Sequence, residues 1–115
     1  MVTQPLWSAD IDQHGSTCTV TLNGELDLIA AEPLRLLLLA RLDRPDTADV
    51  VADLAAVTFL DSAALGILIV AYRRAEQLDR RFALTRPVRS VRRVLEISGV
   101  YDILVAPGGE DPSRG

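Results

Sequence analysis

The residues best placed to do chemistry form a pair in the middle of the chain, Asp61 followed by Ser62. An apolar segment precedes the pair and the apolar run 63–71 follows it, a pattern that favours a helix starting here. Asp or Ser at a helix start can bind N–H groups that the first turn leaves open. Those N–H groups and the positive end of the helix dipole also favour an anion, such as a phosphoserine. The pair therefore predicts either simple capping or a modifiable serine at a helix start.

A phosphate on Ser62 would change the charge of this turn without requiring the domain to unfold. It would add about −1.5 to −2 charges at neutral pH, beside Asp61 and near Asp27. Such a charge would repel a partner whose surface matched the unmodified turn. The pattern thus indicates a switch that acts at a surface and leaves the fold nearly unchanged.

The reactive side chains argue against several classes of enzyme. All 12 basic residues are arginine, so a P-loop lysine and a lysine Schiff base are both excluded. His14 is the single histidine and lies in a polar turn, whereas a metal site normally gathers several ligands. A serine hydrolase needs glycines flanking its serine and a histidine base, and residues 60–64 contain neither. We expect a protein that is not an enzyme and holds no cofactor or metal.

The charge and hydropathy of the chain limit the kinds of partner it can have. The net charge of −4 argues against general nucleic-acid binding. Four arginines at positions 86, 89, 92 and 93 are interpreted as a solvated helix face, because no aromatic residues interleave with them. The apolar runs are far shorter than the roughly 20 residues that cross a bilayer, and the first residues lack a secretory signal. We expect a cytoplasmic protein without a membrane span.

Alternating strand and helix patterns surround the Asp61-Ser62 pair. Strands are predicted at 7–13, 16–23, 49–54 and 81–84, helices at 34–42, 63–78 and 87–97, and a short element at 101–105. This order predicts one small α/β domain with helices packed on a sheet. Cys18 alternates with apolar residues and is predicted to be a buried structural thiol. Residues 107–115 are rich in Pro and Gly and predict a loose tail.

Four short segments form an ordered series of motifs over about residues 8 to 105. They are Asn23-Gly24-Glu25-Leu26-Asp27, Asp53-Leu54, Phe59-Leu60-Asp61-Ser62-Ala63-Ala64-Leu65-Gly66 and Val94-Leu95-Glu96-Ile97-Ser98-Gly99. The series resembles the signatures of bacterial anti-sigma-factor antagonists, members of the STAS domain superfamily. The resemblance implies a STAS-like α/β domain over residues 1–106 and a flexible C-terminal tail over 107–115. Its mixed sheet would have about four to five strands and pack with about four helices.

The resemblance also implies a function in bacterial regulation of transcription. An unphosphorylated antagonist binds an anti-sigma factor that has serine kinase activity, and a sigma factor is released. The kinase then uses ATP to phosphorylate the serine after the motif's aspartate, here Ser62, and a phosphoserine phosphatase resets the switch. Asp27 and Asp61 match acidic positions beside this serine, and with Ala63 and Ala64 they are the implied partner-binding residues. We expect a monomer or weak dimer.

The segment after Ser62 departs from the family pattern. The family usually has a second Ser or Thr and then Gly where this chain has Ala63 and Ala64. Replacing that glycine adds a methyl group and a strong helix former at the helix start. The departure keeps open an alternative function, a non-phosphorylated STAS scaffold or a ligand-binding module in a stress-signalling complex.

Overall fold

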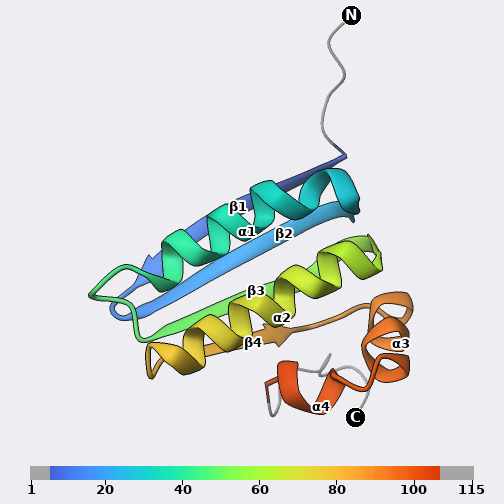
Figure 1. The fold of residues 1–115 in the computed structure, drawn as a ribbon. Helices are drawn as coiled ribbons and strands as arrows, with labels where there is room; N and C mark the ends of the chain where they lie inside the picture. Colours follow the sequence, from blue (N-terminus) through green and yellow to red (C-terminus); the bar gives the residue numbers. More distant parts are fainter. Residues whose placement is uncertain (1–5, 107–115) are drawn as a thin grey trace, which may run out of the picture.

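Strands and helices alternate along residues 6–106, the part of the chain that the computed structural model describes (Figure 1). In chain order the elements are β1 (Trp7–His14), β2 (Thr17–Leu26), α1 (Leu28–Leu42), β3 (Asp49–Leu60), α2 (Ser62–Gln77), β4 (Arg81–Thr85), α3 (Arg89–Ile97) and α4 (Tyr101–Leu104). The strands form one four-stranded sheet in the order β1-β2-β3-β4. β1 is antiparallel to β2, and β2, β3 and β4 run parallel. The predicted α/β fold with a mixed sheet and about four helices is confirmed.

The first two strands, predicted at 7–13 and 16–23, pair with each other as a hairpin. Gly15 lies in its turn with a φ of 58°, a left-handed conformation that glycine adopts without steric cost. The register pairs Trp7 with Gly24 at one end and His14 with Thr17 at the other. β1 ends one residue later than predicted, at His14. β2 begins one residue later than predicted, at Thr17, and runs on to Leu26, because its last two residues pair with β3 rather than with β1.

The core lies between the sheet and the helices α1 and α2. Alternate residues of β2, of β4 and of β3 up to Leu54 are buried, as the two-residue repeat of a strand requires. Beyond Leu54 the buried residues of β3 are Val57 and Leu60. The largest fully buried side chains of the core include Leu22, Leu26, Leu34, Leu38, Leu54, Leu68 and Leu84. Cys18 is also fully buried, which confirms the predicted structural thiol. Burial raises the pKa of this thiol and keeps it in its neutral form.

The two central strands end level with each other. β3 continues to Leu60, beyond the end predicted at residue 54, because its apolar approach to Asp61 stays in the sheet. Leu26 is paired with Leu60 in the parallel register. Since α1 follows β2 and α2 follows β3, both helices begin at the same edge of the sheet (Figure 1).

The first helix begins earlier than predicted. Its first residue is Leu28 rather than residue 34, because Asp27 caps it and the segment that follows is already apolar. Pro33 was expected near the first turn and lies inside the helix. There it removes the N–H that would bond to the carbonyl of Ile29. Periodicity alone placed the start too late, since a proline is normally tolerated only at a helix start.

The C-terminal elements pack on the β4 side of the sheet, α3 against β3 and α4 against β4. α3 begins at Arg89, after the predicted opening at Pro87, and α4 follows as a single short turn. Val105 then forms a parallel bridge with Leu84. Within residues 6–106, no helix has the length and apolar character needed to cross a membrane. The tail expected at 107–115 lies outside the described residues.

Candidate functional site

Two aspartates cap the two helices that start at the shared sheet edge. Asp27 precedes α1, and its Oδ1 accepts hydrogen bonds from the N–H groups of Ile29 at 3.0 Å and Ala30 at 3.1 Å. Asp61 precedes α2, and its Oδ1 accepts from the N–H of Ala64 at 3.0 Å. Each aspartate has the extended backbone of a helix cap. The sequence left the cap of α2 open between Asp61 and Ser62, and the structure assigns it to Asp61.

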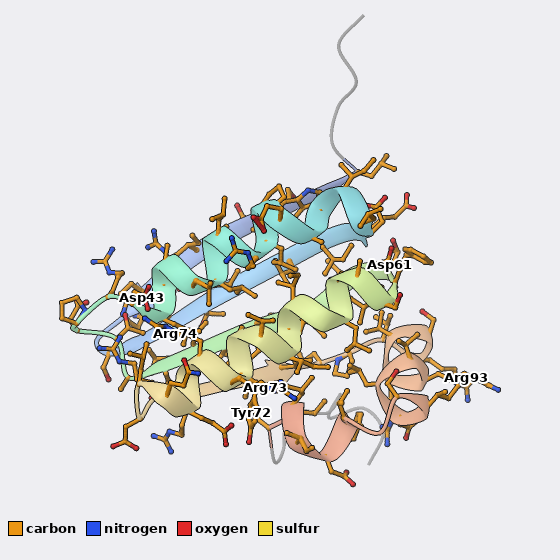
Figure 2. All side chains as sticks on the ribbon, viewed as in Figure 1. Asp43, Asp61, Tyr72, Arg73, Arg74 and Arg93 are labelled. Atoms are coloured by element: carbon orange, nitrogen blue, oxygen red, sulfur yellow. The ribbon has the colours of Figure 1, made fainter. Side chains whose placement is uncertain are left out.

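A backbone hydrogen bond holds the two caps in neighbouring positions. The N–H of Asp61 donates to the carbonyl oxygen of Leu26 across 3.1 Å. Leu26 is the residue directly before Asp27, so the bond joins the end of β2 to the start of α2. The two capping carboxylates therefore belong to one surface, at the end of the molecule where Figure 2 labels Asp61.

Ser62 is the first residue of α2 and is exposed to solvent. Because Asp61 supplies the cap, the Ser62 hydroxyl is not needed to start the helix. Helix geometry leaves the N–H groups of Ser62 and Ala63 without an intrahelical acceptor, and the positive end of the dipole lies here. An anionic group on Ser62 is thus compatible with the observed backbone.

The two alanines after Ser62 have different environments. Ala63 is half-buried at the rim of the surface. Ala64 is fully buried, and its side chain packs in the core while its N–H binds Asp61. Of the residues predicted to bind a partner, Asp27, Asp61 and Ala63 therefore reach the surface, whereas Ala64 acts only through its backbone.

Three large apolar side chains are exposed in the segments next to the two caps. Leu28 and Ile29 follow Asp27 and are 73% and 82% exposed, and Phe59 lies two residues before Asp61 and is 47% exposed. Solvent-exposed side chains of this size beside polar groups are typical of protein-binding surfaces. Sequence reasoning missed them because each belongs to an apolar run that reads as core. The only signal was their position directly beside the two motif aspartates.

Other reactive groups lie far from this edge. His14 pairs with Thr17 at the start of β2, while Ser62 follows the end of β3. At about 3.3 Å per strand residue, the histidine is roughly 30 Å from the serine, which rules it out as a base for Ser62. Its Nε2 instead lies 3.0 Å from the Oδ2 of Asp12. Within residues 6–106, no group of three or more His, Cys, Asp or Glu side chains is arranged to hold a metal ion.

The fold and the paired caps agree with a comparison of the sequence with known families. The profile of the family described as "Mlab, STAS domain" matches residues 9–106. The chain belongs to the STAS domain family. This match includes both capping aspartates and Ser62, so the surface described above is part of the STAS domain itself.

Known proteins similar to this STAS domain include anti-sigma-factor antagonists. The anti-sigma F factor antagonist of Paenibacillus polymyxa is 26% identical over 95 residues, covering 83% of this chain and 81% of that protein. A solved antagonist from Mycobacterium paratuberculosis superposes with a TM-score of 0.78 at 23% identity, covering 96% of this chain and 91% of that one. The antagonist SpoIIAA in its unphosphorylated form gives 0.77 at 21% identity, covering 93% and 90%. The structural likenesses establish the shared fold.

Proposed function

We propose that this STAS domain is an anti-sigma-factor antagonist whose binding surface is centred on Ser62 and is switched off by phosphorylation of that residue. The observation that carries the proposal is that two neighbouring residues at the start of α2 have separate roles. Asp61 caps the helix, and Ser62 is left exposed as the first helical residue. A kinase can therefore modify the hydroxyl without disturbing a hydrogen bond that holds the cap.

The surface around Ser62 suits a protein partner. The exposed side chains of Leu28, Ile29 and Phe59 offer apolar area, and the two carboxylates of Asp27 and Asp61 stay bound to backbone N–H groups. Burial of apolar area drives association, while the fixed carboxylates set the orientation of the partner. The similar proteins that are named anti-sigma-factor antagonists support an anti-sigma factor as this partner.

Phosphorylation would act on this surface through charge. A phosphoserine at position 62 adds about −1.5 to −2 charges beside Asp61. A partner that packs on the unmodified turn would have to bury this charge close to like charges, which costs far more than an apolar contact contributes. As the resemblance to anti-sigma-factor antagonists implies, the proposed partner has a serine kinase activity that uses ATP, and a separate phosphatase reverses the modification. The STAS domain contributes the acceptor and carries out no catalysis.

The test is to map phosphate after incubation with Mg-ATP and candidate anti-sigma-factor kinases from the same organism. Intact mass and peptide mapping are compared for the parent protein, Ser62→Ala and Ser90→Ala, since Ser90 is an exposed serine in the first turn of α3. One phosphate on Ser62, lost only in Ser62→Ala, supports the proposal. A phosphate on another residue overturns the site. No phosphate with kinases that are active on their own antagonists overturns the switch.

A second candidate function, ligand binding without phosphorylation, rests on a groove at the other end of β3. The groove has a volume of about 460 Å³ and is lined mainly by apolar atoms. Its walls include Thr17, Val51, Ala83, Ile103 and Ala106. Val51 lies nine residues before Leu60 on one strand, so the groove is roughly 30 Å from Ser62. A ligand held there would not touch the serine, and its binding would be insensitive to Ser62→Asp.

A further inference from the structure

The outward face of α1 is apolar along most of its length. Ile29, Pro33, Leu36 and Ala40 are all exposed, and Ile29 and Leu36 are 82% and 58% exposed. Their spacing of four, three and four residues places them on one face of the helix. The residues that face the core are a separate set, Ala30, Ala31, Leu34, Leu38 and Leu42. We call the four exposed residues the α1 stripe.

This stripe is unusual for a helix at the surface of a small domain. The solvent face of such a helix normally carries charged and polar residues. In Figure 1, α1 has α2 on one side and lies at the border of the helix layer; among residues 6–106 no helix covers the stripe, since all four of its residues are exposed. Exposed apolar faces of this kind mark sites of association. An apolar surface that packs against the stripe would remove these side chains from water.

The residues of α1 are complementary to a second copy of the same helix. A twofold axis between Pro33 and Leu36 brings each of these residues opposite the other in an antiparallel pair. The same axis places Ile29 opposite Ala40, a large side chain against a small one. Such pairs allow two helices to approach closely and interdigitate.

The charged residues beside the stripe are also complementary under this twofold axis. Glu32 and Arg35 form an ion pair within α1, with Nε and Oε1 2.6 Å apart. Because an antiparallel twofold brings equal flanks of the two helices together, Glu32 of one copy lies near Arg35 of the other. With a rise of 1.5 Å per residue, their offset along the axis is about 3 Å, which these long side chains can span. The two pairs can form a ring of alternating charge.

We infer that the α1 stripe is a self-association surface, on which two copies of this chain pair their α1 helices antiparallel about a twofold axis midway between Pro33 and Leu36. The inference does not depend on phosphorylation of Ser62. One helix face per copy is small beside the roughly 800 Å² per partner of a standard interface, so the dimer is weak and concentration-dependent. It forms and dissociates without a change in the fold of either copy.

The first experiment is sedimentation velocity of the full chain from about 1 µM to about 1 mM, a range that brackets weak association. A monomer–dimer equilibrium is expected. Glu32→Arg and Arg35→Glu each make the ring carry one sign of charge and should weaken dimerisation about tenfold. The double variant with both substitutions restores the alternating charges and should return the dissociation constant to within about threefold of the parent. A monomer throughout the range, or no rescue in the double variant, overturns the proposal.

Cysteine cross-linking tests the antiparallel register, with circular dichroism to confirm that each variant is folded. In the proposed dimer, Leu36→Cys places two thiols within about 5 Å along the axis, whereas Ala40→Cys separates them by about 16 Å. Because Cys18 is buried, the introduced thiol is the accessible one. Under mild oxidation Leu36→Cys should form a covalent dimer and Ala40→Cys should not. Equal cross-linking of both variants, or a stripe that binds an anti-sigma factor but never a second copy, overturns the proposal.

Discussion

Arg86 has a left-handed backbone conformation, with a φ of 54°, and its guanidinium binds the carboxylate of Asp53 in two places. The Nη2–Oδ2 distance is 2.5 Å and the Nε–Oδ1 distance is 3.3 Å. The N–H of Ala55 donates to the same carboxylate at 3.0 Å. The Asp53 side chain is only 13% exposed. Its hydrogen bonds with Arg86 connect the segment after β4 to the middle of β3.

This arrangement predicts a loss of stability in acid that depends on Asp53. Burial acts to raise the pKa of Asp53, but the hydrogen bonds from Arg86 and Ala55 and the charge of Arg86 outweigh it, and the pKa is lowered. A lowered pKa contributes stability above the unfolded-state value of about 3.9 and loses it as the pH falls through the folded-state value. Asp53→Asn should therefore lower the free energy of unfolding at pH 7 by about 1 to 2 kcal/mol.

Urea unfolding at a series of pH values checks this prediction. The difference between the parent and Asp53→Asn should begin to shrink below about pH 4, where the carboxylate of the unfolded parent takes up a proton, and should vanish below the lowered pKa of the folded state. Asp46→Asn is the control, because its exposed ion pair with Arg44 is long, at 3.6 Å, and contributes little. A difference for Asp53→Asn that stays constant with pH would show that the loss comes from packing rather than from charge.

A second prediction concerns the glycine at the end of the hairpin. Gly24 has a φ of 89°, and a Cβ there would lie 2.1 Å from the carbonyl oxygen of Leu6. Gly15 has a φ of 58° but no atom within 4 Å of its Cβ position. Gly15→Ala should cost only the strain of the left-handed backbone, about 1 to 2 kcal/mol. Gly24→Ala should cost about 3 kcal/mol or more, because backbone atoms must also move.

Chemical denaturation of the two glycine variants measures both costs under the same conditions. An equal loss of stability in the two variants would mean that the contact between Gly24 and Leu6 contributes nothing to the cost. A larger loss for Gly24→Ala would explain, in physical terms, why glycine is required two residues before Leu26 in the strand that leads to the site.

Much of the fold could be predicted from the sequence because period and capping act over a few residues. The alternation around Cys18 predicted a strand and a buried thiol, and the Asp61-Ser62 pair predicted a helix start. Pro33 misled the periodic analysis, since the apolar segment before it belongs to the same helix. The strand before Asp61 was predicted to end at residue 54, which is too early, because only the local pattern was read. A local pattern does not show that the sheet register extends to Leu60.

The candidate site was only partly predictable. The aspartates and Ser62 are identifiable because their motif is contiguous, but the hydrogen bond from Asp61 to Leu26 joins distant segments and depends on parallel strand pairing. The exposure of Leu28 and Phe59 is likewise a result of tertiary packing. Ala64 was predicted to bind a partner because it belongs to the motif. Its side chain is fully buried in the core, and the motif alone does not show this.

Substitutions at Asp61 should separate its capping role from its charge. Asp61→Ala removes the acceptor of the Ala64 N–H, and should lower the free energy of unfolding by about 1 kcal/mol. Asp61→Asn keeps an acceptor and should change stability by only a few tenths of a kcal/mol. Thermal unfolding distinguishes the two. If Asn binds the anti-sigma factor as well as Asp does, the negative charge of Asp61 has no part in docking.

Ser62→Asp tests whether charge at this position blocks partner binding while the domain stays folded. The substitution adds a carboxylate in the first turn of α2, where the helix dipole favours it, so stability should stay within about 0.5 kcal/mol of the parent. Binding to the anti-sigma factor, measured by calorimetry, should weaken at least about tenfold, because the new charge lies in the contact surface next to Asp61.

The matched control for this variant is Ser16→Asp, which places the same charge at another exposed serine, in the hairpin turn beside the start of β3 and at the opposite end of that strand from Ser62. It should bind the anti-sigma factor nearly as well as the parent, since Ser16 lies the length of β3, roughly 30 Å, from Ser62, whereas a charge is screened within about 8 Å at physiological salt. Circular dichroism must show both variants folded. Equal weakening by Ser62→Asp and Ser16→Asp would mean that overall charge controls binding, and the local switch at the start of α2 would then be wrong.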